Sequence, residues 1–193
     1  MTYYTERFFL NQVSGITASA AASELRVAAK SAAGDFDVFL SHSVSDQRVI
    51  LGVRKWLMSK GLSVYVDWIV DRQLDRSHVS PATAAVLRRQ MHHSRTLIYA
   101  TSRAASASRW MPWELGFFDG IKGSQHISIL PIDDSTSAGY AGEEYLGLYK
   151  RIEQLTRSTG SKAGYAVSPS GTRVESVKSF AHDARRYEDI DAL

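Results

Sequence analysis

The residues with the clearest chemical potential are Trp110 and Glu114, in the segment 108–114 with sequence SRWMPWE. This segment follows an apolar run typical of a buried strand, and it begins an expected helix on which residues four apart share one face. Ligands of α/β sheets bind at the carboxyl ends of the strands. An aromatic ring beside a carboxylate at such a place suits binding a planar base and stabilising positive charge on a sugar.

Both residues also have an ordinary structural explanation. We expect Glu114 in the first turn of its helix, where a carboxylate is favoured by the helix dipole alone. Trp110 could equally be a core tryptophan, although Trp113 or Phe117 could fill that role in its place.

A second group of polar residues follows the first expected strand. Ser41, Ser43 and Asp46 lie where this strand gives way to a helix. Hydroxyls and a carboxylate at a helix start can bind ribose or phosphate. The same residue types are those that cap helices, and for Asp46 capping is the favoured interpretation.

The long charged loop from 67 to 80 carries three further candidates, Trp68, Arg72 and Arg76. The arginines could contact phosphates or a neighbouring protomer, or be solvated. Trp68 either packs under the loop or takes part in assembly, since a tryptophan exposed to solvent is costly unless other residues or a partner cover it.

Other kinds of chemistry find no support in the sequence. The chain of 193 residues has no cysteine, which excludes disulfides and thiolate catalysis, and its net charge of +3 is too weak to indicate nucleic-acid binding. His92 and His93 point in different directions on a helix and have no partner cluster, so no metal site is expected. No hydrolase elbow, dinucleotide fingerprint or phosphate-binding loop occurs. No signal peptide or membrane-length apolar run is seen, so we expect a cytoplasmic protein without membrane contacts.

The elements that must position these residues alternate between strand and helix, which predicts an α/β fold with a parallel sheet. We expect helices at 16–33, 46–61, 80–92, 108–122, 143–155 and 174–187, strands at 37–40, 62–67, 95–101 and 126–131, and a hairpin of 165–167 with 172–174. The expected architecture is a three-layer, flavodoxin-like sheet of four or five parallel strands. Its buried strand residues should include Val38, Phe39, Val64, Val66, Leu97 and Ile98.

In this order the pieces resemble a TIR domain, the Toll/interleukin-1 receptor fold. The stretch 35–43, DFDVFLSHS, is similar to the family's first box, and Asp46 matches the acid that follows it. The stretch 62–67, LSVYVD, is similar to the second strand, and the loop after it occupies the place of the BB loop. Trp110 and Glu114 match the W-x-x-x-E pattern that carries the catalytic glutamate of TIR enzymes.

The stretch 145–149, YLGLY, also resembles one found in stand-alone bacterial TIR proteins. The resemblance implies a TIR fold with an extra N-terminal helix and a C-terminal extension. The expected organisation is an N-terminal extension at 1–34, a TIR domain at 35–157, and a hairpin and helix at 158–193 packed on that domain.

The resemblance implies cleavage of NAD+ at the nicotinamide–ribose bond, with Glu114 catalytic, Trp110 and Phe39 beside the substrate, and Ser41, Ser43 and Asp46 available to bind it. NAD+ would be a substrate, and no resident cofactor is expected. Products would be nicotinamide and either ADP-ribose or a cyclic isomer, as in antiphage defence of the Thoeris type. Expected partners are other TIR protomers and an effector activated by the product. The alternatives are a non-enzymatic TIR scaffold and an enzyme resembling nucleoside deoxyribosyltransferases.

Overall fold

The fold is built around one eight-stranded sheet. The computed structural model describes residues 2–30, 34–42, 47–66, 81–101, 108, 110–132, 143–183 and 186–190. The strand order is β2-β1-β3-β4-β5-β6-β7-β8. The strands are β1 (Phe36–His42), β2 (Val64–Val66), β3 (Ser94–Thr101), β4 (Ile127–Pro131), β5 (Lys150–Thr156), β6 (Lys162–Val167), β7 (Arg173–Ser176) and β8 (Glu188–Asp189). The helices are α1 (Glu6–Asn11), α2 (Ala18–Lys30), α3 (Gln47–Met58), α4 (Pro81–His92), α5 (Trp110–Lys122) and α6 (Val177–Ala181), with short 3-10 helices η2 (Ser124–His126) and η3 (Glu144–Leu148).

The first five strands of the sheet pair in parallel, in the order β2-β1-β3-β4-β5. This is the flavodoxin-like order, so the prediction of a parallel sheet of four or five strands is confirmed. All six strand residues expected in the core are buried: Val38, Phe39, Val64, Val66, Leu97 and Ile98.

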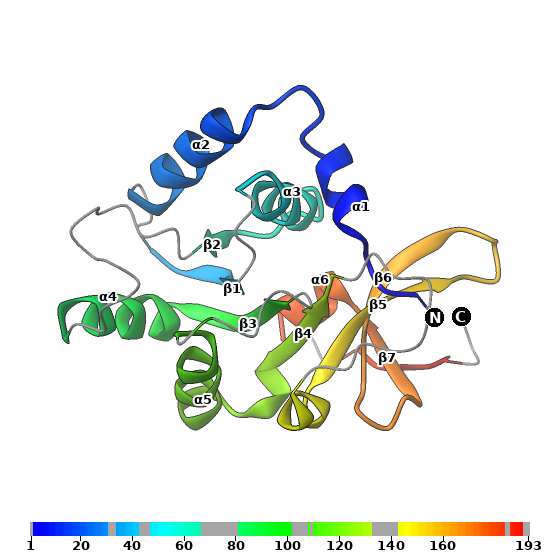
Figure 1. Cartoon of the computed structure of the whole chain (residues 1–193). Coiled ribbons are helices and arrows are strands. Elements are labelled where there is room, and N and C mark those ends of the chain that lie inside the picture. Colours follow the sequence, from blue (N-terminus) through cyan, green and yellow to red (C-terminus); the bar gives the residue numbers. More distant parts are fainter. Residues whose placement is uncertain are drawn as a thin grey trace.

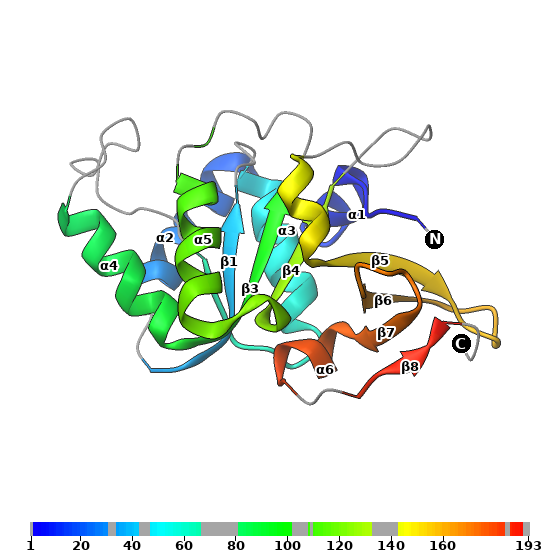
Figure 2. The same ribbon diagram turned by 90° about the horizontal axis from the view of Figure 1, so that it is seen from below.

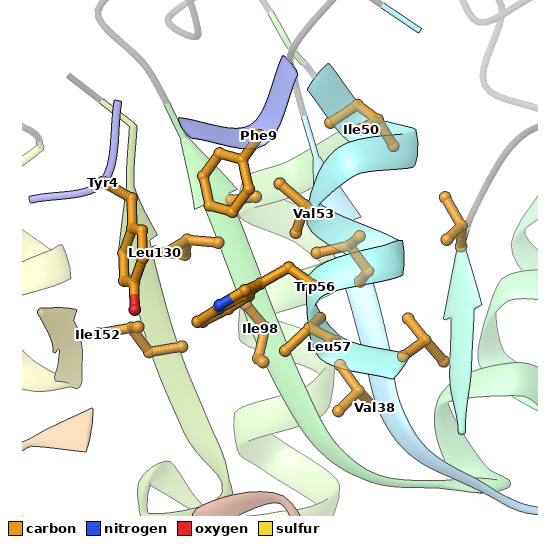
Figure 3. Packing of buried hydrophobic residues seen from close by; sticks show 14 of the residues in the cluster. Tyr4, Phe9, Val38, Ile50, Val53, Trp56, Leu57, Ile98, Leu130 and Ile152 are labelled. Atoms are coloured by element: carbon orange, nitrogen blue, oxygen red, sulfur yellow. The ribbon is translucent and has the colours of Figure 1, made fainter. Parts of the chain in front are cut away.

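Helices cover both faces of the parallel strands, which gives the three expected layers. Helices α1, α2 and α3 lie on one face, and α4 and α5 lie on the other (Figure 1). Because side chains alternate along a strand, β1 contributes to both layers. Val38 and Leu40 belong to the core under α3, which Figure 3 shows from close by, whereas Phe39 belongs to the core under α4 and α5.

The N-terminal segment is built into the first of these cores. Tyr4 forms a bridge with Ile132, and its ring lies 4.8 Å from that of Trp56 in α3. Helix α1 crosses α3 so closely that a Cβ on Gly52 would lie 2.2 Å from the carbonyl oxygen of Phe9. A side chain at position 52 would therefore push α1 away.

The C-terminal part departs from the sequence prediction at two places. The helix expected at 143–155 is wrong, because that stretch forms the short η3 followed by strand β5. The helix expected at 174–187 is also wrong, since α6, of five residues, is the only helix among the described residues of that stretch. The predicted hairpin is confirmed as β6 and β7, which pair antiparallel and extend the sheet beyond β5. The domain boundaries at 34/35 and 157/158 remain predictions.

A buried ion pair joins these added strands to the parallel part of the sheet. Lys150 Nζ in β5 lies 2.7 Å from Glu175 Oε1 in β7. It also donates to the backbone oxygen of Gln125 at 3.0 Å and to the hydroxyl of Tyr187 at 3.2 Å. A buried ammonium is tolerated only when it is paired and hydrogen-bonded in this way.

Candidate active site

The candidate site lies at the topological switch point of the sheet, where the strand order reverses between β1 and β3. Strands β1 and β3 are neighbours, but the helices that follow them cover opposite faces: α3 packs in one core and α5 in the other. In open α/β sheets this arrangement leaves a crevice outside the carboxyl ends of the two strands, where ligands bind. Figure 2 shows α5 beginning beside the tips of these strands and running back along the sheet.

Glu114 reaches this point from α5. Its side chain is 2% exposed, and its Oε2 accepts a hydrogen bond of 2.5 Å from Ser41 Oγ at the end of β1. Because α5 begins at Trp110, Glu114 is the fifth residue of the helix, and its expected place in the first turn is wrong. The helix dipole falls off within one turn, so a favourable helix start does not account for this carboxylate. Burying it has a cost that calls for another explanation.

Trp110 is buried one turn earlier on the same helix. Its ring is 5% exposed and meets Trp113 edge to face, with ring centroids 5.4 Å apart. Its indole N–H is buried and has no hydrogen-bond acceptor within the ranges that the structure describes. Buried donors are nearly always paired, so this one is an exception that needs a reason.

Phe39 and Ser41 approach the same place from β1. Both are fully buried, and as alternate residues of one strand they face the same side of the sheet, toward α5. The ring of Phe39 lies 5.3 Å from that of Tyr65 in β2. The structure therefore brings together four of the predicted site residues: Phe39, Ser41, Trp110 and Glu114.

The other predicted residues, Ser43, Asp46, Trp68, Arg72 and Arg76, lie outside the described residues. Within the described ranges no group of three metal-ligating side chains occurs. Among the helices of those ranges, none has the length and apolar character needed to cross a membrane.

An aromatic stack beside the site was not predicted from the sequence. Trp113 and Phe117 stack with ring centroids 5.6 Å apart, and the guanidinium of Arg88 in α4 lies 5.4 Å from the centre of the Trp113 ring. The i, i+4 spacing of the two aromatic residues was the available signal. This stack fixes α5 against α4 and thereby supports the turn of α5 that carries Glu114.

A separate cavity of about 180 Å³ lies between η3 and the strands β4 and β5. Its lining includes Tyr3, Glu143, Glu144 and Arg151, and it includes none of the four residues Phe39, Ser41, Trp110 and Glu114. It is therefore distinct from the candidate active site.

Two curated proteins are similar to this chain. One is named "Probable 3' cyclic ADP-D-ribose synthase ThsB'", from Bacillus cereus (strain MSX-D12), and is 51% identical over 122 residues, which are 63% of this chain and 62% of that protein. The other is named "Putative cyclic ADP-D-ribose synthase TIR2", from Cytobacillus dafuensis, and is 32% identical over 83 residues, which are 42% of this chain and 22% of that protein. Both similarities agree with the resemblance of the sequence to TIR domains.

No protein-family model matches the chain. The match spans less than two thirds of the length of either relative. The strand order agrees with the same resemblance, and so does helix α5, which begins with Trp110 and carries Glu114.

Proposed function

We propose that this chain is a TIR domain that cleaves NAD+ at the nicotinamide–ribose bond and releases nicotinamide together with ADP-ribose or a cyclic ADP-ribose isomer. The observation that carries the proposal is the buried carboxylate of Glu114, held by Ser41 at the switch point of the sheet. The names of the two similar proteins, both cyclic ADP-D-ribose synthases, support the same substrate and favour cyclisation.

Cleavage of the nicotinamide–ribose bond requires little more than one well-placed negative charge. When the bond from ribose C1′ to the pyridinium nitrogen breaks, its electron pair stays on that nitrogen and nicotinamide leaves neutral. No general acid is therefore needed for departure. The sugar acquires oxocarbenium character, as in glycoside hydrolysis, and the Glu114 carboxylate stabilises that charge and accepts hydrogen bonds from ribose hydroxyls.

The second half of the reaction decides the product. If water adds to C1′ and loses a proton, the product is ADP-ribose. If another nucleophilic atom of the same molecule attacks C1′, the product is a cyclic isomer. The two products differ by one water molecule, so their masses distinguish them.

The neighbouring residues would bind the substrate. Trp110 lies one turn before Glu114 on α5, and Phe39 belongs to the same buried cluster as Trp110. We propose that both contact the nicotinamide-ribose part. From the sequence, Ser43 and Asp46 are proposed to bind ribose or phosphate. Trp68, Arg72 and Arg76 are proposed to contact phosphates or a neighbouring protomer.

The biological setting belongs to the same proposal. A cyclic nucleotide product would act as a signal for a separate effector in a bacterial immune response. The protein would work in the cytoplasm, where NAD+ is present, and would associate through TIR–TIR contacts.

The test is incubation of the purified protein with NAD+, followed by mass analysis of the products with and without a crowding agent. Nicotinamide with a cyclic ADP-ribose isomer, or with ADP-ribose, supports the proposal. Intact NAD+ at high protein concentration would contradict it and favour a TIR scaffold. Exchange of bases on deoxynucleosides would favour the deoxyribosyltransferase-like alternative.

A further inference from the structure

We propose that Ser41 is a positioning residue, whose hydroxyl holds the Glu114 carboxylate in the orientation that the reaction requires. This inference rests on the proposed function, because it concerns the residue that would stabilise the transition state. Ser41 would act on the substrate through Glu114.

The geometry commits the Ser41 proton to Glu114. A serine hydroxyl has one hydrogen to donate, and the hydrogen bond of 2.5 Å to Oε2 uses it, since an ionised carboxylate can only accept. Ser41 is fully buried, and its neighbour in the sheet is Tyr99 of β3, which is 5% exposed. Little room remains for the hydroxyl to turn elsewhere.

The place of Ser41 in the sheet makes it a rigid support. Strand β1 lies in the interior of the sheet, with β2 on one side and β3 on the other. Glu114, in contrast, extends from a helix by a side chain with three rotatable bonds. A contact from a central strand therefore fixes one carboxylate oxygen relative to the sheet, which is how precise sites are built.

The hydrogen bond also favours the charged form of Glu114. Hydrogen bonds to ionised acceptors are about twice as strong as neutral ones. Burial works in the opposite direction because it disfavours a carboxylate that lacks donors. A donor fixed to Oε2 therefore stabilises the charged form. We infer that loss of this donor weakens catalysis more than it weakens the binding of NAD+.

The experiment compares Ser41→Ala with a matched control, Ser128→Ala. Ser128 is also a fully buried serine of the parallel sheet, but its hydroxyl donates to the backbone oxygen of Lys150 at 3.2 Å. The panel also includes Ser41→Thr, Glu114→Gln and the double variant of Ser41→Ala with Glu114→Gln. For each protein, kcat and KM for NAD+ and the melting temperature are measured.

We expect Ser41→Ala to lower kcat about tenfold to a hundredfold, the range set by loss of one charge-assisted hydrogen bond, with KM within about threefold of wild type. Ser41→Thr keeps the hydroxyl and should recover most of the rate. Ser128→Ala should retain wild-type kcat. The double variant should be no slower than Glu114→Gln alone, because a residue that acts through Glu114 has no effect once its charge is gone.

If Ser41→Ala melts below the assay temperature, Ser41→Cys takes its place with the same expected loss, since a thiol has nearly the same shape and is a weak donor. A kcat of Ser41→Ala within twofold of wild type, or an equal loss in Ser128→Ala, would overturn the positioning role if Glu114→Gln is still much slower than wild type. An undiminished effect of Ser41→Ala in the Glu114→Gln background would overturn it too. If wild-type protein releases no nicotinamide, the proposed function fails, and this inference fails with it.

Discussion

Replacement of Trp110 by phenylalanine should change stability very little, although the residue is only 5% exposed. Two effects of opposite sign act on this substitution. Truncating a buried ring leaves a small cavity, with a cost of about 1–2 kcal/mol. The indole N–H that has no acceptor within the described ranges disappears at the same time, and an unpaired buried donor costs about 1–3 kcal/mol.

The two terms nearly cancel, so the free energy of unfolding of Trp110→Phe should lie within about 1 kcal/mol of wild type. For a chain of this size that corresponds to a shift in melting temperature of about 2–4 °C. The measurement is urea and thermal unfolding followed by circular dichroism, because tryptophan fluorescence would itself change.

The matched control is Trp56→Phe. Trp56 is also 5% exposed, and Lys60 Nζ lies 4.7 Å from the centre of its ring. This substitution loses packing and the cation–π contact together, so about 2 kcal/mol is expected. An equal loss of stability in the two variants would show that the Trp110 N–H is bonded in the folded protein and would refute this reasoning. In activity, Trp110→Phe should be milder than Trp110→Ala, which should raise KM and lower kcat.

Three further results are expected. Gly52→Ala should destabilise the protein by about 1–3 kcal/mol in urea unfolding, because the Cβ of alanine would clash with the Phe9 carbonyl. Alanine is the better helix former, so a stabilised variant would contradict the close approach of α1 to α3. Burial, followed by the hydrogen bond to Asp119, raises the pKa of Tyr149 to about 12. The stability that this hydroxyl contributes should therefore be complete below pH 10 and lost as the pH rises toward 12. The melting temperatures of the wild-type and Tyr149→Phe proteins should converge over that interval, and a constant difference between them would contradict this expectation. NADase turnover per molecule should rise with protein concentration if neighbouring protomers complete the site, and concentration-independent turnover would argue against assembly.

The parallel half of the fold could be predicted because its signals are local. Short apolar strands, the proline at the start of α4 and the stripe Val49, Val53, Trp56 and Leu57 on α3 each indicate one element, and all four residues of that stripe are buried. The segment 150–155 was misassigned because its charged and aliphatic residues suit a helix equally well. It becomes a strand only because it pairs with β4 on one side and with β6 on the other. That pairing overrides the local preference.

In the candidate site, too, local signals in the sequence could be predicted and long-range contacts could not. The W-x-x-x-E spacing indicated Trp110 and Glu114, and the sequence placed Ser41 at a strand end. The hydrogen bond between Ser41 and Glu114 joins residues 73 apart in the chain. It depends on the pairing of β1 with β3 and on the face of the sheet that α5 covers. No local sequence pattern predicts either feature. The burial of Glu114 was missed for the same reason.

In the proposed reaction, the buried Glu114 carboxylate stabilises the transition state of NAD+ cleavage. The most direct measurement is the initial rate of nicotinamide release by wild-type protein and by Glu114→Gln at the same concentration, with the melting temperature of each. Gln keeps the shape and removes a charge that is only 2% exposed, so melting should be unchanged or slightly higher. We expect a rate at least about a hundredfold lower for Glu114→Gln, equivalent to about 2.7 kcal/mol of transition-state stabilisation. A folded Glu114→Gln protein that releases nicotinamide at close to the wild-type rate would contradict it.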